Sequence, residues 1–196
     1  MRTRFDKYAE KLRTAREKQL SEKTNKKNTR IRNIGGALFF LGLVLLLWEI
    51  EIYRDTIIDL KIPLSIWLTP GLFLTPIFYN RINALDRKAN WALHYFLHTC
   101  MTGSFLLFSF MATNLYFSDS QSTIKHFNVI NTGSICGPKG HRDEREPYVD
   151  INYEGLEKEV VFTYEETAKV MSAKSVKLTV RKGLLGFDIL EKYEIE

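Results

Sequence analysis

Three long apolar stretches interrupt an otherwise polar chain, and no charged residue occurs within any of them. They cover residues 34–48, 62–79 and 97–117. The second and third have about the length that an α-helix needs to cross a bilayer core of roughly 30 Å. The first is shorter, but it extends through Glu49 and Glu51 to residue 53. The pattern predicts three transmembrane helices, at about residues 34–53, 62–79 and 97–117.

Two of the three predicted helices carry further features. The second stretch contains Pro63, Pro70 and Pro76. Pro70 removes a helix hydrogen bond and clashes with the preceding turn, which predicts a kink near residues 69–71. The third helix is expected to start before the membrane, around residues 86–90, and to run on as one long helix.

Apolar and polar side chains alternate in short segments after residue 118, a pattern typical of strands with one buried face. Strands are expected at about residues 124–130, 149–153, 158–162, 176–180 and 187–193. Glu154 and Gly155 predict a tight hairpin turn between the second and third of these strands.

A short helix is expected between the third and fourth strands. Thr163 and Glu166 have the spacing of a capping box, in which the hydroxyl and the carboxylate satisfy free helix amides. The helix is expected to extend to about residue 172, with Ala168 and Met171 turned inward.

These patterns predict an integral membrane α-helical protein with three transmembrane helices, followed by a small, strand-rich α+β domain at the C-terminus. The expected organisation is a basic cytoplasmic tail over residues 1–33 that can be helical, a transmembrane region over residues 34–117, and an extracytoplasmic domain over residues 118–196. The core of that domain is modest, so docking on the membrane helices or self-association would help to stabilise it.

The net charge of +5 hides an uneven distribution of Lys and Arg. Residues 1–33 carry twelve of them and the loop over residues 81–96 carries three, whereas the loop over residues 49–61 carries two. Basic residues near membrane segments stay on the cytoplasmic side. This rule predicts a cytoplasmic N-terminus and a C-terminal domain outside the cytoplasm. The sequence has no Asn-x-Ser/Thr site, which fits a bacterial envelope protein, and the expected location is the inner membrane of a bacterial cell.

The basic residues nearest the first apolar stretch are candidates for contact with lipid headgroups. Lys and Arg beside a membrane span attract anionic lipid at roughly 1 kcal/mol each. These residues are Lys23, Lys26, Lys27, Arg30 and Arg32. The alternative is that they only determine topology.

Two histidines at the start of the third stretch form the most specific chemical pattern. His94 and His98 are four residues apart, so both imidazoles lie on one helix face, where they can share a metal ion or ligate haem. A zinc site needs a third ligand, and Cys100 lies about 160° around the helix from His98. The alternative is two interfacial histidines without a ligand. The leading interpretation of the sequence includes no cofactor.

The longest irregular piece of the C-terminal domain is the loop over residues 132–147. Its mixed charge and its glycines are typical of an exposed loop, and long loops often carry function. The candidate partner-binding residues are Lys139, His141, Arg142, Asp143, Glu144, Arg145 and Glu146. The alternative is a solvated loop without a partner.

The chain contains no catalytic motif, and its basic charge lies beside the membrane stretches, which argues against nucleic-acid binding. The leading hypothesis is a non-enzymatic multi-pass membrane protein. Its extracytoplasmic module would bind a protein partner or help to assemble an envelope complex. One alternative is a metal- or haem-binding membrane redox protein that uses His94 and His98. A weaker alternative, based on the prolines of the second stretch, is an accessory subunit of a transporter.

Overall fold

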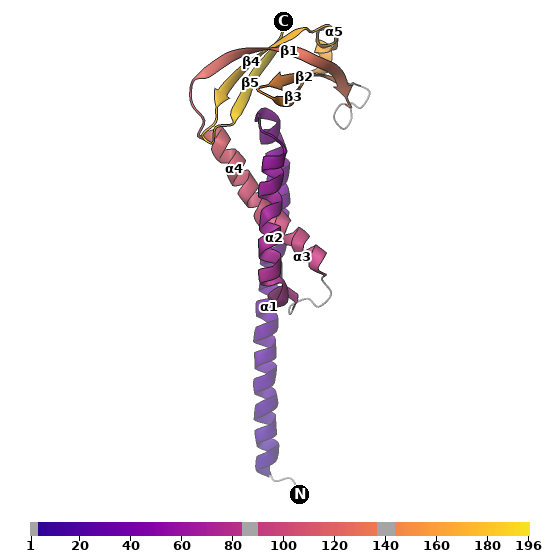
Figure 1. The fold of residues 1–196 in the computed structure, drawn as a ribbon. Helices are drawn as coiled ribbons and strands as arrows, with labels where there is room; N and C mark the ends of the chain where they lie inside the picture. The colour runs from indigo at the N-terminus through magenta and orange to yellow at the C-terminus, as the bar shows by residue number, and fades with distance from the viewer. Residues whose placement is uncertain (1–3, 84–89, 137–143) are drawn as a thin grey trace.

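A long helical stem carries a curved β-sheet at one end in the computed structural model, which describes residues 4–83, 90–136 and 144–196 (Figure 1). Within these residues, three helical segments are long and apolar enough to span a membrane: Lys11–Asp55, Lys61–Asn80 and Trp91–Tyr116. Each of them contains most or all of one apolar stretch of the sequence, and the first also includes much of the basic tail.

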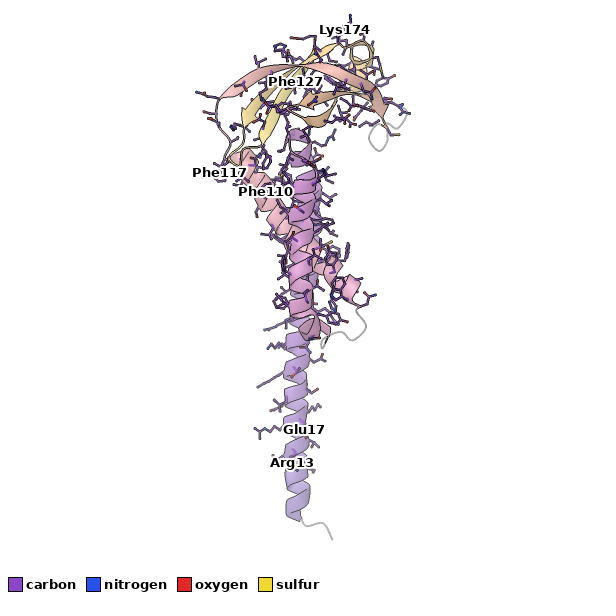
Figure 2. All side chains as sticks on the ribbon, viewed as in Figure 1. Arg13, Glu17, Phe110, Phe117, Phe127 and Lys174 are labelled. Carbon is purple, nitrogen blue, oxygen red and sulfur yellow. The ribbon has the colours of Figure 1, made fainter. Side chains whose placement is uncertain are left out.

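The tail and the first apolar stretch form a single helix. α1 spans Arg4–Asp55 and is 52 residues long. Its N-terminal part, which carries Arg13 and Glu17, extends well beyond the other helices (Figure 2).

The second stretch forms α2, which spans Lys61–Asn83. The helix continues through both Pro70 and Pro76. The kink expected near residues 69–71 stays a prediction.

The third stretch is not the uninterrupted α-helix that the sequence predicts. It consists of α3 over Trp91–His98, a π-helical turn η1 over Thr99–Gly103, and α4 over Ser104–Tyr116. Asn90 caps α3 by accepting a hydrogen bond from the Leu93 N–H at 2.9 Å. A π-helical turn closes its hydrogen bonds over one more residue than an α-helix. It keeps the same apolar composition, which is why hydropathy does not reveal it.

The C-terminal domain is built on a five-stranded antiparallel sheet that curves as a half-barrel. Its strands are β1 (Ser122–Ile135), β2 (Glu146–Tyr153), β3 (Leu156–Val161), β4 (Ser175–Lys182) and β5 (Asp188–Ile195), in the order β3-β2-β1-β4-β5. The first half of β1 pairs with β4 and the second half pairs with β2. A bulge between Val129 and Asn131 lies where the partner changes, and bulges bend strands.

The predicted strands are confirmed, and so is the hairpin turn between β2 and β3. Both turn residues have positive φ, 54° at Glu154 and 94° at Gly155, as tight hairpin turns require.

The short helix after β3 differs in detail from the prediction. It begins as a 3₁₀ turn, η2 over Tyr164–Glu166, and continues as α5 over Thr167–Met171. The Thr163 hydroxyl donates to the Glu166 carboxylate at 3.1 Å instead of capping a helix amide. Val170 is buried, whereas Ala168 and Met171 are exposed. The 3₁₀ turn has three residues per turn, so it changes which residues face inward.

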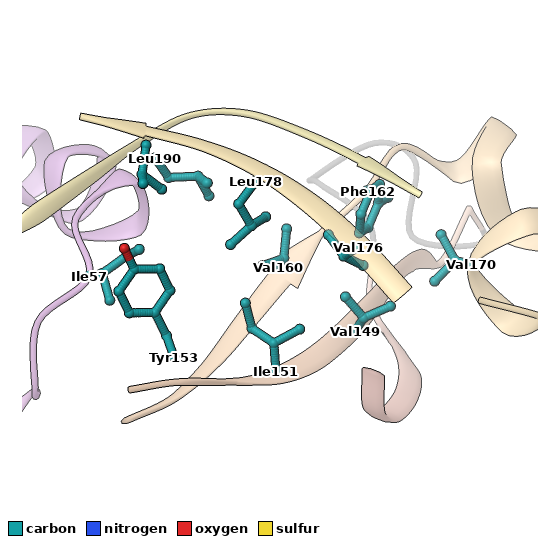
Figure 3. Packing of buried hydrophobic residues seen from close by; sticks show 11 residues of the cluster. Ile57, Val149, Ile151, Tyr153, Val160, Phe162, Val170, Val176, Leu178 and Leu190 are labelled. Carbon is teal, nitrogen blue, oxygen red and sulfur yellow. The ribbon is translucent and has the colours of Figure 1, made fainter. Parts of the chain in front are cut away.

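The core of the domain fills the concave face of the sheet (Figure 3). Ile57, from the loop between α1 and α2, is part of it, and its N–H donates to the Asp188 carbonyl at 2.8 Å. Thr56 forms an isolated antiparallel bridge with Ile189 of β5. The buried members are Ile57, Val149, Ile151, Tyr153, Val160, Phe162, Val170, Val176, Leu178, Val180 and Leu190. The α1–α2 loop is therefore built into the domain that follows the helices.

Candidate functional site

A lysine of β3 attaches the sheet to the end of α1. Lys158 Nζ donates hydrogen bonds to the carbonyl oxygens of Arg54 at 2.8 Å, Thr56 at 3.0 Å and Tyr53 at 3.4 Å. The carbonyl end of a helix favours a cation, because its last carbonyl groups lack partners within the helix. Burial lowers the pKa of Lys158, and the carboxylate of Asp55 opposes that shift. This contact, named here the α1 clamp, fixes β3 against the end of the first apolar helix.

A second contact attaches the turn between β4 and β5 to the end of α4. The fully buried Asn114 donates from Nδ2 to the Phe187 carbonyl at 3.0 Å and accepts the Leu185 N–H on Oδ1 at 3.0 Å. Gly183 lies against the same side chain, because a Cβ there would be 2.3 Å from Asn114 Oδ1. This contact, the α4 clamp, ties the other half of the sheet to the third apolar segment.

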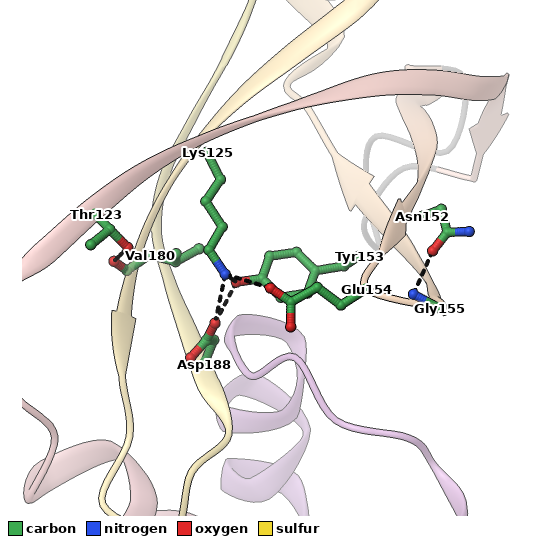
Figure 4. Close-up of polar contacts among 8 residues, drawn as sticks. All are labelled: Thr123, Lys125, Asn152, Tyr153, Glu154, Gly155, Val180 and Asp188. Carbon is green, nitrogen blue, oxygen red and sulfur yellow. Dashed lines mark hydrogen bonds and ion pairs between the residues drawn. The ribbon is translucent and has the colours of Figure 1, made fainter.

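A polar cluster lies in the concave face beside the α1–α2 loop (Figure 4). Lys125 Nζ donates to Tyr153 Oη at 2.7 Å, Glu154 Oε1 at 2.8 Å and Asp188 Oδ2 at 3.3 Å. The Tyr153 hydroxyl also donates to Asp188. These residues border a cavity of about 620 Å³, within the usual size range of small-ligand sites.

The cluster raises the pKa of both its lysine and its tyrosine, so both bind their protons more tightly than usual. Burial alone would lower the pKa of Lys125, but hydrogen bonds to Glu154, Tyr153 and Asp188 outweigh it and raise the pKa. Burial and the hydrogen bond to Asp188 raise the pKa of Tyr153 to about 12. A general base needs a pKa near the operating pH, so these two groups are suited to holding strands together and not to accepting a proton.

The raised pKa of Tyr153 predicts a loss of stability in alkali. Below pH 10 the hydroxyl is protonated in both the folded and the unfolded chain, and its stabilising effect is fully present. As the pH rises through about 12, the effect is lost, because the unfolded chain releases its proton first. Folding raises the pKa of Tyr153 from 10.0 to about 12, and each pKa unit corresponds to about 1.4 kcal/mol. We therefore expect the alkaline loss of unfolding free energy to be about 2–3 kcal/mol smaller in Tyr153→Phe than in the unaltered chain.

The measurement is the free energy of unfolding of the full chain at pH 9 and at pH 12, compared between variants. Tyr164→Phe is the matched control, because the Tyr164 side chain is 52% exposed. An alkaline loss that is the same in Tyr153→Phe and in the unaltered chain would contradict the prediction.

A groove lies between the two edge strands of the half-barrel, β3 and β5, next to the end of α1. Its volume is about 650 Å³. Val161, Leu190 and Tyr193 contribute apolar surface to its wall. The charged residues that line it are Glu51, Asp55, Asp59, Glu157 and Glu159, with Arg54 and Lys158. The lining of this β3–β5 groove is therefore acidic.

The structure places His94 and His98 on α3, which packs against α2. His94 is 1% exposed, and its ring meets that of Tyr79 edge-on with 5.2 Å between centroids. Within the described chain, three imidazole nitrogens have no hydrogen-bond partner: Nδ1 and Nε2 of His94, and Nε2 of His98. Residues 4–83, 90–136 and 144–196 contain no group of three His, Cys, Asp or Glu side chains that could hold a metal ion. The metal site stays a prediction that rests on two imidazoles.

The predicted partner-binding loop is described only in part. Arg145 donates from Nε to the Ser134 hydroxyl and from Nη2 to the Ser134 carbonyl, both at 2.9 Å, which joins the two strands at the base of the β1–β2 hairpin. Glu144 precedes β2 and Glu146 begins it. The positions that lie outside the described residues are Lys139, His141, Arg142 and Asp143.

The predicted lipid-contacting residues all lie on α1, before its apolar part. The side chains of Lys23, Lys26, Lys27, Arg30 and Arg32 are exposed. Their contact with lipid headgroups stays a prediction.

Sequence reasoning missed the two clamps and the groove. Asn114 offered a signal, since it is a strongly polar residue inside an apolar stretch. Lys158 offered none, because a lysine in an alternating strand is typical of a solvent-facing position. Comparisons of the chain with protein-family models, with curated proteins and with solved structures found no match.

Proposed function

We propose that this protein is a multi-pass protein of the inner membrane that holds its half-barrel outside the cytoplasm and presents it to a protein partner. Three helical segments with the length and composition of membrane spans support the membrane part of this proposal. The excess of Lys and Arg before the first span, and between the second and the third, supports a cytoplasmic N-terminus. With three crossings, the sheet then lies on the opposite side.

The observation that carries partner binding is an open sheet edge on a domain whose position is fixed. The α1 clamp and the α4 clamp tie the half-barrel to two helix ends, and Ile57 of the α1–α2 loop belongs to its core. Within the described chain, β3 is an outer strand of the sheet and pairs only with β2. An exposed edge is a template for pairing with another chain. A firmly held edge offers a partner a preformed surface, which lowers the entropic cost of binding.

The test combines photocrosslinking in intact cells with labelling of a natural thiol. A photoreactive amino acid replaces Glu144 at the base of the β1–β2 hairpin, Glu159 on β3, or Lys11 in the tail as a control. We expect a discrete protein adduct from Glu144 or Glu159 and a different pattern from Lys11. Cys136 is exposed and Cys100 is buried, so a membrane-impermeant maleimide is expected to label Cys136 without lysis.

Each half of the proposal can fail separately. Absence of an adduct from both Glu144 and Glu159 would overturn partner binding. Labelling of Cys136 only after lysis would overturn the orientation, and Cys136→Ser identifies the signal from that thiol.

A further inference from the structure

Resting on the proposed function, we infer that the β3–β5 groove binds an extended, basic segment of a protein partner, which pairs as an added strand with the free edge of β3. Three properties of the groove point to this occupant. They are the direction of the backbone amides of β3, the strand pairing already present at β5, and the charge of the lining.

The outer edge of β3 offers backbone amides at the spacing that a further strand needs. Phe162, directly after β3, donates its N–H to the Pro147 carbonyl of β2 at 2.8 Å. N–H groups alternate in direction along a strand of an antiparallel pair. The N–H groups of Val161, Glu159 and Glu157 therefore point away from β2, and all three residues line the groove.

The opposite edge of the sheet already accepts extended backbone. Thr56 forms its bridge with Ile189, and the Ile57 N–H donates to the Asp188 carbonyl at 2.8 Å. This pairing involves only the beginning of β5, which continues to Ile195. The half-barrel thus already pairs with a short extended segment at one edge, and an added strand at β3 would occupy the groove between the two edges.

The charge of the lining selects the chemistry of the added strand. Five carboxylates and two basic side chains line the groove, a net charge of −3, and the Lys158 ammonium is already engaged in the α1 clamp. A segment rich in Lys or Arg is attracted there, whereas nucleic acid and anionic lipid headgroups are repelled. Side chains alternate along a strand, so apolar residues between the basic ones can meet Val161, Leu190 and Tyr193.

The test uses the full chain in nanodiscs of zwitterionic lipid and a short peptide of alternating Lys and Val with blocked ends. One control peptide alternates Glu and Val, and a second carries a methyl group on every backbone nitrogen of the Lys–Val peptide. Binding is measured by isothermal titration calorimetry. We expect the Lys–Val peptide to bind at least about tenfold more tightly than either control, a difference of about 1.4 kcal/mol.

Variants at one position separate charge from backbone pairing. Glu159→Gln removes one exposed carboxylate and is expected to weaken binding of the Lys–Val peptide about two- to fivefold. Glu159→Pro also removes an outward N–H, at a position where proline is tolerated on edge strands, and is expected to weaken binding about tenfold more. Glu165→Gln, at an exposed residue that does not line the groove, is expected to leave binding unchanged.

The possible outcomes are distinguishable from those for the proposed function. Equal binding of the Lys–Val and Glu–Val peptides would overturn the selection by charge. Equal binding of the methylated peptide would overturn strand pairing, and this arm does not depend on the folding of Glu159→Pro. If no peptide binds while Glu144 or Glu159 still gives an adduct in cells, this inference is wrong and partner binding stands.

Discussion

Replacing Gly42 with alanine is expected to destabilise the helical stem by about 3 kcal/mol, because the added methyl group has no room. A Cβ at Gly42 would lie 2.1 Å from the carbonyl oxygen of Cys100 and 3.2 Å from its carbonyl carbon. Both atoms belong to the backbone of η1, so they cannot rotate away as the tip of a side chain can. α1 and η1 would have to separate. Small residues at such contacts allow the backbones of membrane helices to approach closely.

Gly35→Ala is the matched control on the same helix. Nothing lies within 4 Å of a Cβ built at Gly35, so alanine there only improves helix propensity, by about 1 kcal/mol. The free energy of unfolding of both variants is measured in mixed micelles by titration with a denaturing detergent, followed by circular dichroism. Opposite signs are expected for the two changes, and equal unfolding free energies would contradict the contact between α1 and η1.

The π-helical turn is packed closely on two sides. A Cβ at Gly103, the last residue of η1, would lie 2.1 Å from the carbonyl oxygen of Trp67 in α2. Gly42 of α1 and Gly103 of η1 thus bring three helical backbones together at one level of the stem. Clamps at the end of α1 and at the end of α4 can hold the sheet in place only if these helices keep their relative positions.

The features that the sequence predicted are those with a local physical cause. Apolar stretches predict helices able to span a membrane, because a span must be apolar along its whole length. Alternation placed Val149, Ile151 and Tyr153 on one face, and all three are buried. The sheet order and the core position of Ile57 depend on contacts between distant segments, which no local pattern encodes.

The parts of the candidate site that escaped prediction are also long-range. The side chain of Asn114 contacts Leu185 and Phe187, which follow it by 71 and 73 residues. Lys158 faces a helix end instead of water, because the end of α1 lies against that part of the half-barrel. The histidines were chosen for residue type and local spacing, and the loop for its length and composition. Such local features do not indicate which distant groups the fold brings together.

Replacing Asn114 with leucine is expected to lower the free energy of unfolding by about 3 kcal/mol and to release the β4–β5 turn from α4. Leucine has the same number of side-chain heavy atoms with the same branching, but it leaves the Leu185 N–H and the Phe187 carbonyl without their partner. Each such loss in a buried setting costs about 1–3 kcal/mol. Asn114→Asp separates the two bonds, because a carboxylate still accepts the Leu185 N–H but cannot donate to the Phe187 carbonyl.

Hydrogen exchange of the Leu185 amide in the full chain gives a readout that general destabilisation does not mimic. We expect this amide to lose its protection in Asn114→Leu and to retain it in Asn114→Asp. Asn128→Leu, at an exposed position of β1, is expected to leave it unchanged. Slow exchange of Leu185 in Asn114→Leu would mean that the α4 clamp does not hold the turn. The half-barrel would then be attached to the helices by the α1 clamp alone. The fixed position of the β3 edge would depend on that one contact.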